Sequence, residues 1–363
     1  MHIAEIFLKD WRNIAEIKFF PDVATNIFLG QNAQGKTNIL EAINFASLLR
    51  SRAGKEAELI RWGEKSALAR IKFFKADISH ELAIEISHTQ RRRILLDANP
   101  IRPRELVGKL NSVLFSPEDL FLFKGSPMGR RKFLDAQISQ ASSLYFFNLL
   151  KYNRIIEQRN ILLKKIRDRF AKENELELWD EQLALIAEQI LIKRLKSVET
   201  LNLLANSMHQ KISARKEDLS IVYEMHGLES QENIAEKFLN LLRAKRVDDI
   251  RNGSTGKGPH KDDLKFFING RELKIFGSQG QLRTAALALK LSELQFLKSE
   301  TGEYPLLLLD DVMSELDAER REMLLEFLRR EKIQTLITAT DRAYFPPQSF
   351  GKFFLINAGR LTE

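Results

Sequence analysis

Residues 26–43, NIFLGQNAQGKTNILEAI, constrain this chain more than any other stretch. Gly30, Gly35, Lys36 and Thr37 fit the spacing G-x-x-x-x-G-K-[ST] without a mismatch. Apolar residues before Gly30 predict the end of a buried strand, and those after Thr37 recur at helical spacing. A glycine loop between a strand and a helix turns successive backbone N–H groups toward one anion, and the helix dipole adds positive charge. We therefore predict a phosphate-binding loop rather than an ordinary surface turn.

Each part of this loop has a predicted task. Lys36 supplies a point charge for the outer phosphates, and the Thr37 hydroxyl can ligate Mg²⁺. Arg12 and Asn13 lie in a turn between two predicted strands, and they can reach the nucleotide if that turn folds over the loop. An ordinary polar turn would account for these two residues equally well. The loop residues expected around the phosphates are Gly30, Gln31, Asn32, Ala33, Gln34, Gly35, Lys36 and Thr37.

Composition excludes several other kinds of chemistry. The chain has 363 residues and no cysteine, which removes disulfides, thiolate zinc sites and thiol nucleophiles. Its six histidines form no H-x-x-x-H pair, and no apolar run approaches the length of a membrane span. A net charge of +8 suits a polyanionic partner, although many basic proteins bind no nucleic acid. We expect a soluble cytoplasmic protein with no membrane partner.

A second group of polar residues follows an apolar strand near the C-terminus. Residues 306–309 are four leucines, and Asp310 and Asp311 come directly after them. A buried strand that ends in two carboxylates places them at the ligand-binding edge of an open α/β sheet. Asp310 fits a carboxylate that holds Mg²⁺, and Asp311 fits a group that orients or deprotonates an attacking water.

A second helix start can also bind an anion. Ser278 is placed as the N-cap of a strong helix that runs to about Leu297, in the stretch FGSQGQLRT. The plain alternative is a capped helix with no ligand.

The order of predicted elements indicates an α/β protein with an inserted helical region. Residues 144–170 have helical apolar spacing, and a second helix of similar length begins near Trp179, so the two predict a short antiparallel helical arm. We divide the chain into an N-terminal part (1–125), a helical lobe (126–250) and a C-terminal part (251–363).

Three basic clusters are candidates for contact with DNA phosphates. Three adjacent arginines at residues 91–93 more often mark a solvated strand edge than a DNA contact. The other two clusters lie in or next to the predicted helical lobe. The three sets are Arg91 to Arg93, Arg130 to Lys132, and Lys245, Arg246 and Arg251.

Together these motifs resemble a known family. The phosphate loop, the S-x-G-Q stretch, LLLLDD and SELD resemble the ABC-type ATPase heads of the SMC-like group, and within that group the whole chain resembles the RecF family of bacterial recombinational-repair proteins. The stretches that indicate RecF most specifically are 115–120, 130–135, 258–263 and 310–317. The short helical insert also fits, because other SMC-like proteins carry much longer arms.

The resemblance implies a mechanism built on two subunits. Two ATP molecules would lie between a head-to-tail pair, each held by the phosphate loop of one chain. Ser278, Gly280 and Gln281 of the partner chain would close over the γ-phosphate, and Asp317 would cross the interface. Asp310 would hold Mg²⁺, and Asp311 would act on the water, so that ATP drives dimerisation and hydrolysis releases it.

The resemblance also implies a substrate and partners. The substrate would be DNA near a single-strand/double-strand junction, and the role would be to help load recombinase together with RecR and possibly RecO. Many ABC heads carry Glu where this chain has Asp311, and the shorter side chain predicts slow turnover. The resemblance as a whole implies a weak, DNA-stimulated ATPase. Thr340 stands where transporters carry a switch histidine. Two alternatives stay open: a subunit that energises a membrane transporter, and a clamp that binds nucleotide without hydrolysing it.

Overall fold

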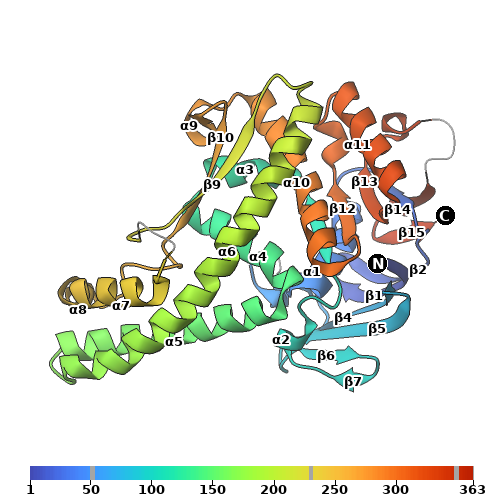
Figure 1. Cartoon of the computed structure of the whole chain (residues 1–363). Coiled ribbons are helices and arrows are strands. Elements are labelled where there is room, and N and C mark those ends of the chain that lie inside the picture. Colours follow the sequence, from blue (N-terminus) through green and yellow to red (C-terminus); the bar gives the residue numbers. More distant parts are fainter. Residues whose placement is uncertain (50–53, 229–231, 347–350, 363) are drawn as a thin grey trace. The chain divides into compact units, whose positions relative to one another are not determined.

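The computed structural model describes residues 1–49, 54–228, 232–346 and 351–362. The chain forms two compact units, and Figure 1 labels most of their helices and strands. The first unit comprises Met1–Leu120, Lys211–Ala214 and Arg283–Glu363, and the second comprises Phe121–Gln210 and Arg215–Leu282. The first unit contains two large sheets and the second is mostly helical, so the predicted α/β class with a helical lobe is confirmed.

An antiparallel sheet forms one layer of the first unit. Its strand order is β2-β1-β4-β5-β6-β7. Alternate residues along β4 are buried, as expected for a sheet with one face on the core. The strands are β1 (His2–Trp11), β2 (Ile14–Phe19), β4 (Ser66–Lys75), β5 (Ile78–Ser87), β6 (Arg93–Leu96) and β7 (Asn99–Pro100).

A mostly parallel sheet forms the other layer. Its order is β15-β14-β3-β13-β12-β8, and only the terminal β14–β15 pair is antiparallel. Every residue of β3, β12 and β13 is buried, which explains their continuous apolar character. The carboxyl ends of these three strands therefore lie at one edge. The strands are β3 (Thr25–Leu29), β8 (Ser112–Phe115), β12 (Leu306–Asp310), β13 (Thr335–Ala339), β14 (Lys352–Asn357) and β15 (Arg360–Thr362).

Helix α1 (Lys36–Leu48) joins the cores of the two sheets. Its residues Ile43 and Phe45 belong to a single apolar cluster with Ile71 of the antiparallel sheet and Leu308 of the parallel sheet. Because α1 is covered on several sides, its start is held firmly at the end of β3. Other helices of this unit are η1 (Glu56–Leu59), α2 (Pro103–Leu106), η2 (Pro117–Leu120), η4 (Val312–Ser314), α11 (Ala318–Glu331) and η5 (Arg342–Tyr344).

Two long helices form the frame of the second unit. Helix α5 (Ser143–Arg167) and helix α6 (Leu176–Ile212) run antiparallel, because Asn148 bonds Gln189 while Arg159 pairs with Asp180 nearer the turn. Helix α6 has 37 residues and α5 has 25, so the second helix is longer than the sequence indicated. The other helices are α3 (Phe121–Lys124), α4 (Pro127–Ala141), η3 (Glu173–Glu175), α7 (Ile234–Ala244), α8 (Arg246–Asn252) and α9 (Leu273–Phe276).

The second unit ends later than the predicted boundary at residue 250. It includes a three-stranded sheet of order β11-β10-β9, in which β9 (Leu219–Glu224) pairs along its length with β10 (Asp263–Ile268). The hairpin strand β11 (Arg271–Glu272) completes the sheet. Since these pairs tie residues 263–272 to β9, the unit boundary falls within α10 (Gln279–Thr301) instead.

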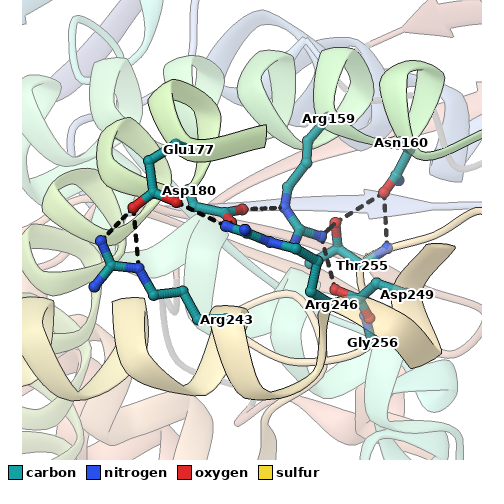
Figure 2. Close-up of polar contacts among 9 residues, drawn as sticks. All are labelled: Arg159, Asn160, Glu177, Asp180, Arg243, Arg246, Asp249, Thr255 and Gly256. Carbon is teal, nitrogen blue, oxygen red and sulfur yellow. Dashed lines mark hydrogen bonds and ion pairs between the residues drawn. The ribbon is translucent and has the colours of Figure 1, made fainter. Parts of the chain in front are cut away.

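A buried ionic network joins the helices of the second unit (Figure 2). Arg159 is fully buried and donates to Asp180 at 2.6 Å and to Asp249 at 2.7 Å. The same guanidinium donates to the Thr255 hydroxyl at 2.8 Å. Arg246 meets the other oxygen of Asp180 at 2.7 Å. These bonds connect α5, α6, α8 and the following loop, so the guanidinium groups of Arg159 and Arg246 stabilise the fold.

None of the helices in the described residues has both the length and the apolar character that a membrane span requires.

Candidate nucleotide-binding site

The predicted phosphate loop has the backbone geometry that its glycines indicate. Gly35 precedes the first residue of α1 and has a φ of 109°, a conformation that side chains rarely adopt. A Cβ at Gly35 would lie 2.7 Å from the Asn13 side chain, and one at Gly30 would collide with the carbonyl oxygen of Ile356. Both positions therefore exclude a side chain.

Lys36 turns back over its own loop. Its ammonium group donates to the backbone oxygens of Gly30 and Gln31, the latter at 2.9 Å. Burial lowers the pKa of Lys36, while the nearby carboxylates of Asp311 and Asp310 act in the opposite direction. An anion placed beside the loop would favour the charged form of this lysine.

The loop and the acidic strand meet directly. The Thr37 hydroxyl donates to an oxygen of Asp310 at 2.7 Å, although the two residues are 273 positions apart. The Thr338 hydroxyl, at the end of β13, lies 3.0 Å from the same oxygen. A hydroxyl and a carboxylate are both hard oxygen ligands, so Thr37 and Asp310 fit the donor set that Mg²⁺ prefers.

Asp311 has an unusual backbone and an unpaired oxygen. Its φ is 55°, in the left-handed region, and its N–H donates to the Thr338 hydroxyl at 2.9 Å. One side-chain oxygen is buried and has no hydrogen-bond partner among the described residues. Burial raises the pKa of Asp311, and Asp310 and Glu315 add to this against the opposing charge of Lys36. Asp311 and Thr338 line a cavity of about 120 Å³ together with residues 32–38.

Arg12 and Asn13 lie in different surroundings. Asn13 lies against the loop: it accepts a bond from the Asn38 amide at 2.7 Å. Arg12 instead forms a two-pronged pair with Glu41 of α1 at 2.9 and 3.0 Å. The structure thus brings Asn13 to the loop and engages Arg12 with α1, and a nucleotide contact by either residue stays a prediction.

The chain matches a family model described as the RecF/RecN/SMC N terminal domain over residues 2–348. It is 43% identical over 348 residues to the DNA replication and repair protein RecF of Halothermothrix orenii, which covers 94% of this chain and 92% of that protein. It is 41% identical over 373 residues to RecF of Heliobacterium modesticaldum, which covers 100% and 99% of the two chains. The chain belongs to the RecF family.

Solved structures agree with this assignment. A RecF structure described as RecF-ATP, a recombination mediator protein in the RecFOR pathway, aligns with a TM-score of 0.92 at 37% identity over 99% of this chain and 97% of that one. The SMC head bound to a winged-helix domain of ScpA aligns at a TM-score of 0.59 and 14% identity over 99% of this chain and 96% of that one, which supports the fold alone. The predicted RecF resemblance and ABC-type ATPase head are confirmed, and membership of RecF disfavours the transporter alternative.

The Ser278 helix start is capped and exposed. The Gln281 N–H donates to the Ser278 hydroxyl at 3.2 Å, while the Ser278 N–H donates to the Gln281 side chain at 3.0 Å. The Gln281 amide also donates to Glu217 at 2.8 Å. Ser278 and Gly280 both face solvent. The alternative of a capped helix accounts for these bonds, so the ligand role stays a prediction.

Asp317 caps α11 and is half exposed. It accepts a bond from the Arg320 N–H at 2.9 Å, and its side chain pairs with the Arg320 guanidinium. That guanidinium also donates to the Thr284 hydroxyl of α10 at 2.7 Å. The turn that carries Asp317 is therefore tied to α10.

Sequence reasoning missed Thr338. One hydroxyl contacts the side chain of Asp310 and the backbone of Asp311, so it holds the two acidic residues in relation to each other. The available signal was a threonine that ends a buried strand beside the acidic strand. The sequence pattern instead indicated Thr340, because it stands where transporters carry histidine.

Proposed function

We propose that this chain is an ATP-dependent DNA-binding protein of recombinational repair. ATP drives head-to-tail dimerisation and DNA clamping near single-strand/double-strand junctions, and slow hydrolysis releases the clamp. The observation that carries the proposal is the contact of the Thr37 hydroxyl with Asp310 at 2.7 Å, next to the buried, unpaired oxygen of Asp311. This contact unites a phosphate loop with an acidic strand, which is the arrangement needed to bind and hydrolyse a nucleoside triphosphate.

The phosphate loop would hold the triphosphate. Its N–H groups and the start of α1 would bind phosphate oxygens, and Lys36 would exchange its two backbone carbonyl partners for the outer phosphates. Asn13 lies against the loop and would bind near it, as would Arg12 after it leaves Glu41. Thr37 and Asp310 would hold Mg²⁺, which supplies charge neutralisation of the phosphates when bound.

Asp311 would act on the attacking water. Its unpaired oxygen faces no competing donor among the described residues and is therefore available to accept a proton or a water O–H. Its backbone N–H is anchored by Thr338, which limits how the carboxylate can reorient. Aspartate reaches less far than glutamate, and this supports slow turnover.

A partner subunit would complete the site. The capped, exposed start of α10 offers Ser278, Gly280 and Gln281 to the γ-phosphate of a second copy. Asp317, on the turn tied to α10 by Arg320, would contact the partner across the same interface. ATP would then act as part of the contact surface, so its presence favours the dimer.

The candidate DNA-binding clusters differ in how many free cations they offer. Arg130 forms a buried two-pronged pair with Asp263 at 2.7 Å, and Arg246 is held by Glu177 and Asp180. Lys245 and Arg251 both pair with Asp248, and Arg131 donates to a backbone carbonyl. In the 91–93 cluster Arg92 pairs with Glu56, whereas Arg91 and Arg93 point to solvent. This pattern favours residues 91–93 as the place of DNA contact.

We propose a cytoplasmic setting and cooperation with RecR and possibly RecO in loading recombinase. The support is the description of a solved relative as a mediator in the RecFOR pathway.

A mass measurement with and without ATP tests the proposal. We expect monomer without nucleotide and dimer with ATP, and Asp311→Asn should keep the dimer longer by slowing hydrolysis. Asp77→Asn is a matched control, because it makes the same carboxylate-to-amide change at an exposed residue outside the phosphate loop. If ATP binds without any increase in mass, the head-to-tail model fails. If Asp311→Asn releases phosphate at the normal rate, Asp311 has no chemical role and a non-hydrolysing clamp becomes the better account.

A further inference from the structure

A fully exposed tryptophan lies in the turn that leads into β4 of the antiparallel sheet. The side chain of Trp62 is 99% exposed, whereas Trp11 is fully buried. Tryptophan usually buries most of its large apolar surface, so complete exposure of the ring is unusual. The exposure therefore needs an explanation beyond folding.

The turn that carries Trp62 is well anchored. The Arg61 N–H donates to the carbonyl of Asp10 at 2.8 Å, and the Glu64 N–H donates to the carbonyl of Arg61 at 3.0 Å. Gly63 has a φ of 88°, which allows the chain to reverse immediately after the tryptophan. The backbone thus holds the indole in solvent on a fixed support.

Free cations lie beside this turn. The His88 N–H donates to the carbonyl of Lys65 at 3.2 Å, which places the turn between β5 and β6 next to the Trp62 turn. Lys65, Arg91 and Arg93 are exposed, and no hydrogen bond or ion pair within the described ranges engages their side chains. We call Trp62, Lys65, His88, Arg91 and Arg93 the Trp62 surface.

Arg92, between the two free arginines, turns inward. It pairs with Glu56 and its guanidinium lies 5.9 Å from the ring centre of Phe45. This contact fixes the backbone of the β5–β6 turn against η1, immediately before the Trp62 turn. The backbone next to Arg91 and Arg93 is therefore held in place.

Charge alone does not define the ligand here. Exposed carboxylates at Glu64 and Glu85 lie among the three free cations. The small positive excess would hold a polyanion only weakly, so the ring must contribute much of the contact. An unpaired nucleic-acid base offers both a flat face for the indole and adjacent phosphates for the cations.

A protein partner fits this surface less well. Tryptophan hot spots lie within a wider contact surface that excludes water. Among the described residues, the other exposed large apolar side chains in or next to the strands of the antiparallel sheet are Phe20, at 53%, Val23, at 61%, and Ile78, at 60%. Phe20 follows the residue paired with Ile6, and Ile78 begins β5 opposite Lys75, so both lie at the far ends of their strands from Trp62.

We propose that Trp62 stacks on an unpaired base of single-stranded DNA while Lys65, Arg91 and Arg93 contact the neighbouring phosphates. The proposal deepens the proposed function and rests on it. It places single-strand contact at the turn before β4 and the neighbouring β5–β6 turn of the first unit. Stacking is tolerant of sequence, because every base has an aromatic face.

Binding of a fluorescently labelled thymidine oligonucleotide to the full chain with ATP tests the proposal. Trp62→Ala should weaken binding about 5- to 150-fold, the effect of one lost base–aromatic stack. Trp62→Phe should retain most of the affinity, because a phenyl ring also stacks. Ile78→Ala, an exposed apolar residue at the other end of the sheet, should bind like the unaltered chain. Equal affinity of Trp62→Ala and the unaltered chain would overturn the proposal.

A salt series adds an independent measurement. Each lost phosphate contact reduces the slope of log K against log salt by about 0.7 for single strands. Arg91→Ser with Arg93→Ser should therefore reduce it by about 1.4. An unchanged slope would show that Arg91 and Arg93 do not contact phosphates.

Two further measurements distinguish failure of this proposal from failure of the proposed function. Trp62→Ala should weaken single-strand binding more than blunt-duplex binding, because duplex bases are already stacked; an equal loss on both would contradict base stacking. The second measurement is the KM of Trp62→Ala for ATP in the absence of DNA. If this KM rises while DNA affinity is unchanged, the indole contacts adenine rather than DNA, and the proposal is overturned. If the unaltered chain binds no DNA at all, the proposed function fails as well.

Discussion

Replacement of Arg159 by methionine tests whether the buried ionic network holds the second unit together. Arg159 and Asp180 are both fully buried, and Asp249 is 4% exposed. Removal of one partner from a buried pair costs about 3–5 kcal/mol, because a charge is left without compensation. Asp180 keeps Arg246 at 2.7 Å, and Asp249 keeps the Gly256 N–H at 2.9 Å. We therefore expect the lower end, about 3 kcal/mol of unfolding free energy.

Calorimetry and guanidinium unfolding would measure this loss. For a unit of this size, about 3 kcal/mol lowers the melting temperature of the second unit by roughly 6–12 °C. Arg251→Met is the matched control, since that side chain is 76% exposed and its pair with Asp248 should contribute less than about 0.5 kcal/mol. Asp249→Asn added to Arg159→Met should recover part of the loss, because it removes the uncompensated charge. A loss below about 1 kcal/mol for Arg159→Met, or one equal to the control, would refute the reasoning.

Three further predictions concern the site and the pH response. Lys36→Arg keeps the charge but changes its shape, so ATP turnover should fall more than ATP binding; normal turnover would contradict the assignment of the loop. Thr338→Val should lower ATP turnover about 10- to 100-fold, because only the hydroxyl holds both acidic residues, and Thr338→Ser should retain turnover. Equal steady-state rates for Thr338→Val and the unaltered chain would exclude this role. Burial lowers the pKa of His260 to about 4 from an ordinary 6.5, so the folded state binds fewer protons than the unfolded state between these values. Stability should thus fall as the pH drops from about 6.5 toward 4, by up to about 3 kcal/mol, and His260→Gln should flatten this limb of the unfolding curve.

Local sequence patterns predicted the parts of the molecule that depend on neighbouring residues. The glycine spacing of residues 30–37 identified the phosphate loop, because a short loop between strand and helix specifies its own backbone. Four leucines before Asp310 identified the central strand, because a strand covered on both faces must be apolar throughout. Helical periodicity likewise located α5 and the start of α6, although it underestimated the length of α6.

Only the tertiary structure decided which charges are free and which polar groups meet. Arg130 and Arg91 look alike in the sequence, but Arg130 is neutralised by Asp263, 133 residues away, and Arg91 is exposed. Thr338 became visible as part of the site only when β13 was placed beside β12. The boundary within α10 depended in the same way on the pairing of β9 with β10. The physical reason is that backbone conformation follows mainly from adjacent residues, whereas ion pairs and hydroxyl contacts form between segments that the folded chain brings together from distant positions.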